Sequence, residues 1–231
     1  MTTRPRQLIL DWPHQPSFAR EDFLSAPSNR EALNAIDRWP DWPGRMLLLA
    51  GPVGSGKSHL AALWAKTAGA AIVHGENLGA ESAQAASVQG SALLIEDADR
   101  VGDAEERLFH LINSALQTEA WVLLTARQGP DAWGLKIPDL LSRLRLAPVI
   151  RLDVPEIELT EAVLFKLFSD RQLQVEPQVI AYVARRIERS LGAARRVVAV
   201  LDREALAKGR RVTRAMASEL IREIAPDGEA P

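Results

Sequence analysis

The feature of this sequence that most constrains its fold is a glycine-rich stretch that fits the pattern G-x-x-x-x-G-K-S. It lies between an apolar run, Arg45–Ala50, and a helical pattern over His59–Ala68, which is the context in which this pattern cradles phosphate. Glycines let backbone N–H groups turn inward around a phosphate, and the start of the helix adds partial positive charge. An ordinary glycine-rich turn would not need both flanks. We therefore predict a nucleotide site made by Gly51, Pro52, Val53, Gly54, Ser55, Gly56, Lys57 and Ser58.

Two side chains of this loop and two acidic residues have separate predicted tasks. Lys57 is expected to reach the β and γ oxygens of ATP or ADP, and the Ser58 hydroxyl is expected to bind Mg²⁺. Glu96 and Asp97 end the apolar run Leu93-Leu94-Ile95, and the carboxyl end of a parallel strand faces the same crevice as the loop. We predict that Glu96 lies on the metal side and that Asp97 orients a water. The alternative, acidic residues that cap a turn, stays open.

Short apolar runs alternate with helical patterns through the first two thirds of the chain. The expected strands are Arg45–Ala50, Ala70–His74, Ala92–Ile95, Trp121–Thr125 and Pro148–Leu152. A helix over Asp103–Leu116 is expected to begin with Asp103 as its N-cap and Glu106 at the capping-box position. Continuous apolar strands separated by helices indicate an α/β fold with a parallel five-stranded sheet that is covered on both faces.

The character of the sequence changes after Pro155. Four helical patterns follow with no strand between them, over Glu158–Asp170, Pro177–Ile187, Ala193–Lys208 and Thr213–Ile224. We therefore expect an N-terminal segment (1–20), an α/β nucleotide-binding domain (21–154), a small all-helical lid domain (155–225) and a tail (226–231).

Charge and composition exclude several classes of protein. The chain has 28 basic and 30 acidic residues among 231, so its surface as a whole is not built to bind nucleic acid. It contains no cysteine, which excludes disulfides and thiolate metal sites. The longest apolar runs are too short to cross a bilayer, and residues 1–18 lack the apolar stretch of a signal peptide. We expect a soluble cytoplasmic protein with no membrane partner.

The loop and the acidic pair resemble those of the AAA+ ATPases, and three further segments narrow the resemblance to the DnaA group. Leu124-Thr125-Ala126-Arg127 is similar to sensor 1, which implies that Thr125 lies near the γ-phosphate. Residues 137–144, Ile-Pro-Asp-Leu-Leu-Ser-Arg-Leu, resemble the arginine-finger box, which implies that Arg143 is the finger. Arg189-Ser190-Leu191 falls where sensor 2 is expected, with Arg189 as the first candidate and Arg195 as the second. The resemblance covers about residues 6–224.

The first residues of the chain resemble a short peptide that docks on the DNA polymerase sliding clamp (its beta subunit). Gln7, Leu8 and Leu10 carry this resemblance, because a glutamine and alternating apolar side chains suit a surface pocket. Asp11-Trp12 departs from the usual pattern, in which an aromatic residue or proline follows the leucine. The alternative is an edge strand packed on the body of the protein.

Two differences separate the chain from the initiator DnaA itself. The sequence stops just after the predicted lid, where DnaA has a helix-turn-helix domain for duplex DNA, and residues 75–91 contain no lysine or arginine with which to hold single-stranded DNA. The resemblance therefore implies a regulator of the Hda type. Such a protein binds nucleotide and the clamp, can form a homodimer, has no strong direct DNA binding, and presents Arg143 to ATP on a neighbouring DnaA. A helicase or transposase loader and a small-molecule P-loop kinase are the alternatives.

Overall fold

Five parallel strands form one sheet in the order β2-β3-β4-β1-β5 in the computed structural model, which describes residues 20, 23–79 and 90–224. The strands are β1 (Met46–Ala50), β2 (Ala71–His74), β3 (Ala92–Glu96), β4 (Trp121–Ala126) and β5 (Val149–Arg151). The predicted parallel five-stranded sheet is confirmed. Glu96, which we expected just after a strand, is the last residue of β3.

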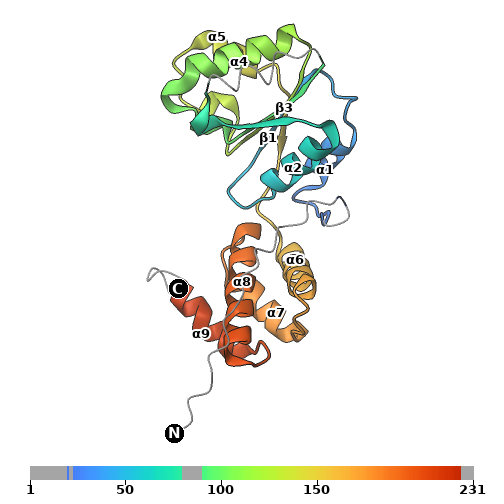
Figure 1. The fold of residues 1–231 in the computed structure, drawn as a ribbon, viewed down its shortest axis with the longest axis vertical. Helices are drawn as coiled ribbons and strands as arrows, with labels where there is room; N and C mark the ends of the chain where they lie inside the picture. Colours follow the sequence, from blue (N-terminus) through green and yellow to red (C-terminus); the bar gives the residue numbers. More distant parts are fainter. Residues whose placement is uncertain (1–19, 21–22, 80–89, 225–231) are drawn as a thin grey trace.

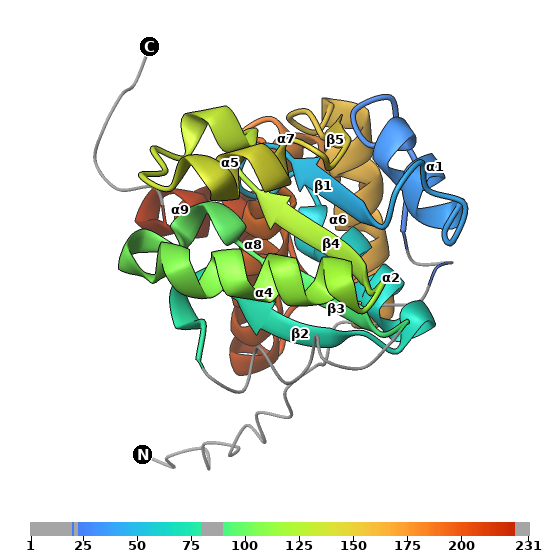
Figure 2. The ribbon, with the colours of Figure 1, turned by 90° about the horizontal axis from the view of Figure 1, so that it is seen from above.

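Helices cover both faces of the sheet (Figures 1 and 2). On one face lie α4 (Glu105–Gln117) and α5 (Pro138–Leu144), and on the other lie α1 (Arg30–Asp37) and α2 (Lys57–Ala68). Alternate residues of each central strand point to opposite faces. In β1, for example, Leu48 packs with α4 and α5, and Leu49 packs with α1 and α2. The sheet is thus buried on both sides, as its continuous apolar strands require.

The start of α4 differs from the prediction. Asp103 lies in a short 3-10 turn, Gly102–Ala104, and Ala104 occupies the N-cap position with no side-chain hydrogen bond. Gly102 has a left-handed backbone (φ 52°), and the chain turns tightly there before it becomes helical. The predicted capping box of Asp103 and Glu106 is therefore wrong.

The C-terminal part of the chain has four helices and no strand among its described residues. It consists of α6 (Ile157–Asp170), α7 (Pro177–Ala184), α8 (Leu191–Lys208) and α9 (Arg214–Ile224), which share a separate apolar core. Thr213 caps α9, because its hydroxyl accepts a hydrogen bond from the N–H of Met216 (3.3 Å). These helices lie on the side of α1 and α2, away from α4 and α5 (Figure 1).

In the part of the chain that the structure describes, none of the helices has both the length and the apolar character that crossing a membrane demands.

Candidate functional site

The glycine-rich loop connects β1 to α2 in a conformation that depends on its glycines. Gly54 and Gly56 have left-handed backbones, with φ of 79° and 106°. A Cβ atom at Gly51 would lie 2.3 Å from the carbonyl oxygen of Leu152, the residue after β5. The loop is therefore held tightly between the ends of two neighbouring strands, and larger residues would not fit at these positions.

Lys57 is the buried cation of this loop. Its Nζ donates hydrogen bonds to the carbonyl oxygens of Gly51 (2.7 Å) and Pro52 (2.9 Å). Burial lowers the pKa of Lys57, although the nearby carboxylates of Asp97 and Asp99 partly oppose that shift. A buried ammonium group whose hydrogen-bond partners are neutral carbonyls is electrostatically suited to an anion.

Ser55 gives a second indication that the loop suits an added group. Its Oγ atom is buried and has no hydrogen-bond partner among the described residues. An unsatisfied buried hydroxyl is costly in a protein interior. Together with Lys57, it makes the residues of the loop compatible with a bound phosphate.

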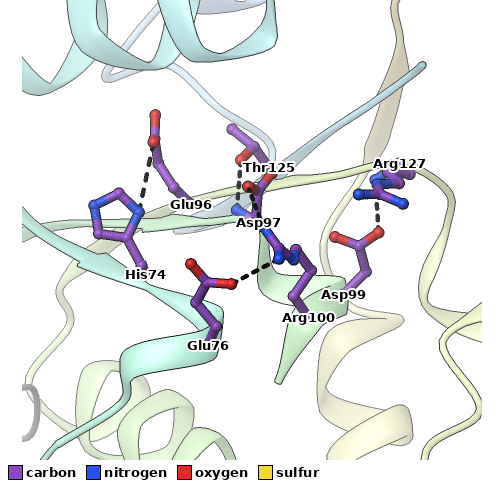
Figure 3. Close-up of polar contacts among 8 residues, drawn as sticks. All are labelled: His74, Glu76, Glu96, Asp97, Asp99, Arg100, Thr125 and Arg127. Atoms are coloured by element: carbon purple, nitrogen blue, oxygen red, sulfur yellow. Dashed lines mark hydrogen bonds and ion pairs between the residues drawn. The ribbon is translucent and has the colours of Figure 1, made fainter. Parts of the chain in front are cut away.

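The acidic pair and the predicted sensor 1 residue come together at the ends of β3 and β4 (Figure 3). Asp97 has a left-handed backbone (φ 48°), and its N–H donates a hydrogen bond to Oγ1 of Thr125 (2.9 Å). Thr125 is completely buried. The Thr125 hydroxyl thus fixes the turn that carries Asp97, and two of the predicted catalytic residues lie in direct contact.

Ion pairs surround this turn. The carboxylate of Glu96 lies 3.7 Å from Nδ1 of His74 in the neighbouring strand β2, and burial raises the pKa of Glu96 although His74 opposes the shift. Arg100 lies 2.8 Å from the carboxylate of Glu76 and 3.9 Å from that of Asp97 (Figure 3). The negative charge of the acidic pair is therefore only partly balanced by neighbouring cations.

The start of α8 touches the glycine-rich loop. The N–H of Leu191 donates a hydrogen bond to the carbonyl oxygen of Gly54 (2.8 Å), and a Cβ atom at Gly54 would lie 2.2 Å from Oγ of Ser190. Ser190 is the N-cap of α8, since its side chain accepts a hydrogen bond from Ala193 N–H. Sequence reasoning missed this contact, although a serine directly before a helical pattern is a recognised start signal.

The two candidates for sensor 2 point to different places. Arg189 donates two hydrogen bonds to the carbonyl oxygen of Pro155, at 3.2 and 3.1 Å, in the segment between β5 and α6. Arg195 in α8 instead reaches α2, where its Nη2 lies 3.2 Å from Nδ1 of His59, two residues after Lys57. The second candidate is thus the one whose side chain contacts the helix that follows the loop.

Arg143 lies on the surface of α5. Its side chain is exposed, and it lines a cavity of about 540 Å³ together with residues of α4 such as Phe109 and Asn113. It makes no ion pair within the described ranges 23–79 and 90–224. Arg145, two residues further along the chain, forms an ion pair with Asp131. The helix that carries Arg143, α5, lies on the face of the sheet opposite the C-terminal helices (Figure 1).

Two arginines contact the ring of Tyr182 in α7: Arg186, which follows this helix, and Arg214, the first residue of α9. The guanidinium carbon of Arg186 lies 3.9 Å, and that of Arg214 4.7 Å, from the ring centroid of Tyr182. Arg214 is distant from Tyr182 in the sequence, so the fold alone brings this second cation to the aromatic ring.

Comparison with known proteins identifies the fold. No protein-family model matches the chain. Domain III of the replication initiation protein DnaA from Thermotoga maritima is similar in structure, with a TM-score of 0.78 at 20% identity over 93% of this chain and all of that one.

Two other solved structures support the same assignment. DnaA from Aquifex aeolicus, bound to AMPPCP, has a TM-score of 0.72 at 15% identity over 91% of this chain and 70% of that one. The RuvB branch migration motor of Thermotoga maritima has a TM-score of 0.63 at 20% identity over 85% of this chain and 66% of that one. The chain therefore shares the fold of these DnaA and RuvB structures.

Proposed function

We propose that this protein is a nucleotide-binding AAA+ regulator of replication initiation that, like Hda, stimulates hydrolysis of the ATP bound to DnaA. The observation that carries the proposal is the exposed Arg143 on α5, which has no ion-pair partner among the described residues. An arginine without a carboxylate partner is available to an anionic group on another molecule.

The nucleotide site of this regulator consists of residues 51–58 with Glu96, Asp97 and Thr125. A bound nucleotide with Mg²⁺ would supply the phosphates and the cation. Lys57 holds phosphate oxygens, Ser58 and Glu96 hold the cation, and Asp97 orients a water. Within the described residues no group of three or more histidine or acidic side chains is arranged to hold a metal by itself. Binding of Mg²⁺ together with phosphates fits such a sparse ligand set.

One of the two sensor 2 candidates, Arg189 or Arg195, also contacts the nucleotide. Arg195 is better placed, because its contact with His59 brings it close to the start of α2. In DnaA from Aquifex aeolicus the bound nucleotide is AMPPCP, which supports ATP or ADP as the ligand here.

Arg143 acts on a nucleotide that another molecule holds. Its guanidinium would enter the site of a neighbouring DnaA and donate hydrogen bonds to the γ-phosphoryl oxygens, where negative charge develops during hydrolysis. Arginines supplied in this way accelerate hydrolysis by about 10³–10⁵. The protein's own nucleotide then has a conformational role.

The predicted clamp-binding residues Gln7, Leu8 and Leu10 lie outside the described residues, so the clamp contact is proposed from the sequence alone. It would place the regulator on clamps that surround newly replicated DNA. A homodimer is the remaining partner that we propose.

A loader that binds DNA is the second candidate function. It is favoured by the similarity to a DnaA structure bound to AMPPCP and single-stranded DNA, with a TM-score of 0.70 at 17% identity. Absence of lysine and arginine from residues 75–91 speaks against it. The exposed arginine on α5 has no role in the third alternative, a small-molecule P-loop kinase.

Reconstitution tests the proposal. Purified protein, clamp loaded on DNA and DnaA carrying radiolabelled ATP are mixed, and ADP formation is followed. Arg143→Ala should reduce the stimulated rate at least ~100-fold. Arg145→Ala is the matched control, because Arg145 is also exposed but is paired with Asp131. Full stimulation by Arg143→Ala would exclude the finger, and tight binding to single-stranded DNA without stimulation would favour the loader.

A further inference from the structure

Glu105 is a buried carboxylate to which the proposed function assigns no role. It is the first residue of α4, and only 8% of it is exposed, whereas its neighbour Glu106 is exposed. A buried carboxylate needs hydrogen bonds or a cation to offset the loss of hydration. The hydrogen-bond donors to the Glu105 carboxylate therefore indicate its structural role.

The partners of Glu105 are backbone N–H groups directly before α5. The N–H of Lys136 donates to both carboxylate oxygens, at 3.1 and 2.9 Å, and the N–H of Ile137 donates to Oε2 at 3.0 Å. Ile137 is the N-cap residue of α5, and Pro138 has no N–H to offer. Hydrogen bonds to an ionised carboxylate are about twice as strong as those between neutral groups.

This contact matters because α5 is short. The helix has only seven residues, and so brief a helix has little stability of its own. Leu140 and Leu144 pack into the core and hold one side of it. Glu105 holds the segment through which the chain enters it, while Arg143 projects from the exposed side.

Glu105 also ties α5 to the nucleotide site. It lies at the end of the short turns that follow Asp97, and these turns are hydrogen-bonded to Thr125 in β4 and to Arg127 directly after it. Asp97 N–H binds Thr125 Oγ1, and the carboxylate of Asp99 accepts a hydrogen bond from Arg127 N–H at 3.1 Å. One stretch of chain, residues 97–105, is therefore hydrogen-bonded at its start to the end of β4 and at its end to the segment before the helix that bears Arg143.

We propose that Glu105 is a positioning residue that fixes α5, and with it Arg143, in the orientation needed to reach the nucleotide of a neighbouring molecule. This inference rests on the proposed function of Arg143. The capping of α5 by Glu105 can be tested without DnaA, so the two ideas can fail separately.

The test compares three variants: Glu105→Ala, Glu105→Gln and the control Glu106→Ala. In the reconstituted reaction Glu105→Ala should lower the maximal stimulated rate about tenfold, because a small displacement of a reacting group is costly. The protein concentration for half-maximal stimulation and the affinity for ADP should not change. Glu105→Gln keeps one acceptor oxygen and should restore the rate to within about threefold of the original.

Hydrogen exchange supplies the independent measurement. In Glu105→Ala, the amides of Lys136, Ile137 and α5 should exchange faster than in the unaltered protein, while those of α2 should not. Equal exchange in the two proteins would overturn the capping by Glu105. If Glu105→Ala exchanges faster but keeps the full stimulated rate, while Arg143→Ala loses stimulation, Glu105 does not position Arg143.

Two remaining outcomes are also decisive. If Arg143→Ala itself leaves stimulation intact, the proposed function fails, and the exchange experiment still decides whether Glu105 holds α5. If Glu105→Ala unfolds, Glu105→Gln decides the proposal. Its amides in and before α5 should exchange somewhat faster than in the unaltered protein, and its stimulated rate should lie between those of the unaltered protein and Arg143→Ala. A rate as low as that of Arg143→Ala, with no change in exchange, would overturn the proposal.

Discussion

Nη2 of Arg195 in α8 lies 3.2 Å from Nδ1 of His59 in α2. Because a guanidinium has no acceptor, Arg195 is the donor and Nδ1 of His59 carries no proton in this contact. The pair joins the C-terminal helices to the helix that follows the glycine-rich loop. Burial lowers the pKa of Arg195, so this side chain is more desolvated than an ordinary surface arginine.

The first prediction concerns which arginine serves the nucleotide. Arg195→Ala should weaken ADP binding about tenfold, the effect of losing one charge-assisted hydrogen bond. Arg189→Ala is the matched control, because Arg189 donates to the Pro155 carbonyl instead. Calorimetric titration of both variants measures the difference. The reverse order of affinities would identify Arg189 as the contact.

The second prediction tests the loop itself. Lys57→Ala should weaken ATP and ADP binding by at least ~100-fold, because the buried ammonium that faces the phosphates is lost. Lys66 lies on the exposed side of the same helix, so Lys66→Ala should bind ATP and ADP with the affinity of the unaltered protein. The measurement is the rise in melting temperature with added nucleotide. A rise that survives in Lys57→Ala would contradict the site.

The third prediction concerns the contact between the loop and α8. Gly54→Ala would place a methyl group 2.2 Å from Ser190 Oγ on a left-handed backbone, so it should lower the free energy of unfolding by about 2 kcal/mol. Gly44→Ala is the control, since a Cβ there meets nothing within 4 Å. Urea denaturation checks both. Equal stability of the two variants would mean that Ser190, at the start of α8, does not pack tightly against Gly54.

The fourth prediction is a pH dependence. Because burial raises the pKa of Glu96, its contribution to folding is complete below its ordinary value of 4.5 and is lost as the pH rises through the folded value. Glu96→Gln should therefore increase the free energy of unfolding at pH 7.5, by less than about 1 kcal/mol. The increase should vanish near pH 4.5.

The control for this prediction is Glu106→Gln, at an exposed position. It should change stability little at either pH. Denaturation curves at several pH values make the comparison. A stabilising effect of Glu96→Gln that persists in acid would show that its cause is not the ionised carboxylate.

Local patterns in the sequence were enough to predict the sheet, the loop and most of the helices. Each depends on neighbours in the chain: an apolar run before Gly51, a lysine at a fixed spacing, or helical periodicity after Pro155. Such signals need no knowledge of distant residues. The start of α4 escaped them, because the turn at Gly102 delays the helix beyond Asp103.

The sequence by itself determined the alternation of strands and helices and the residues of the glycine-rich loop, since both arise from short-range periodicity and backbone freedom. The tertiary structure decided that Arg195 rather than Arg189 touches α2, and that Glu105 holds the entry to α5. These contacts join residues separated by 136 and by 31 or 32 positions. Only the packing of α8 against the loop and of α4 beside α5 brings them within hydrogen-bond distance.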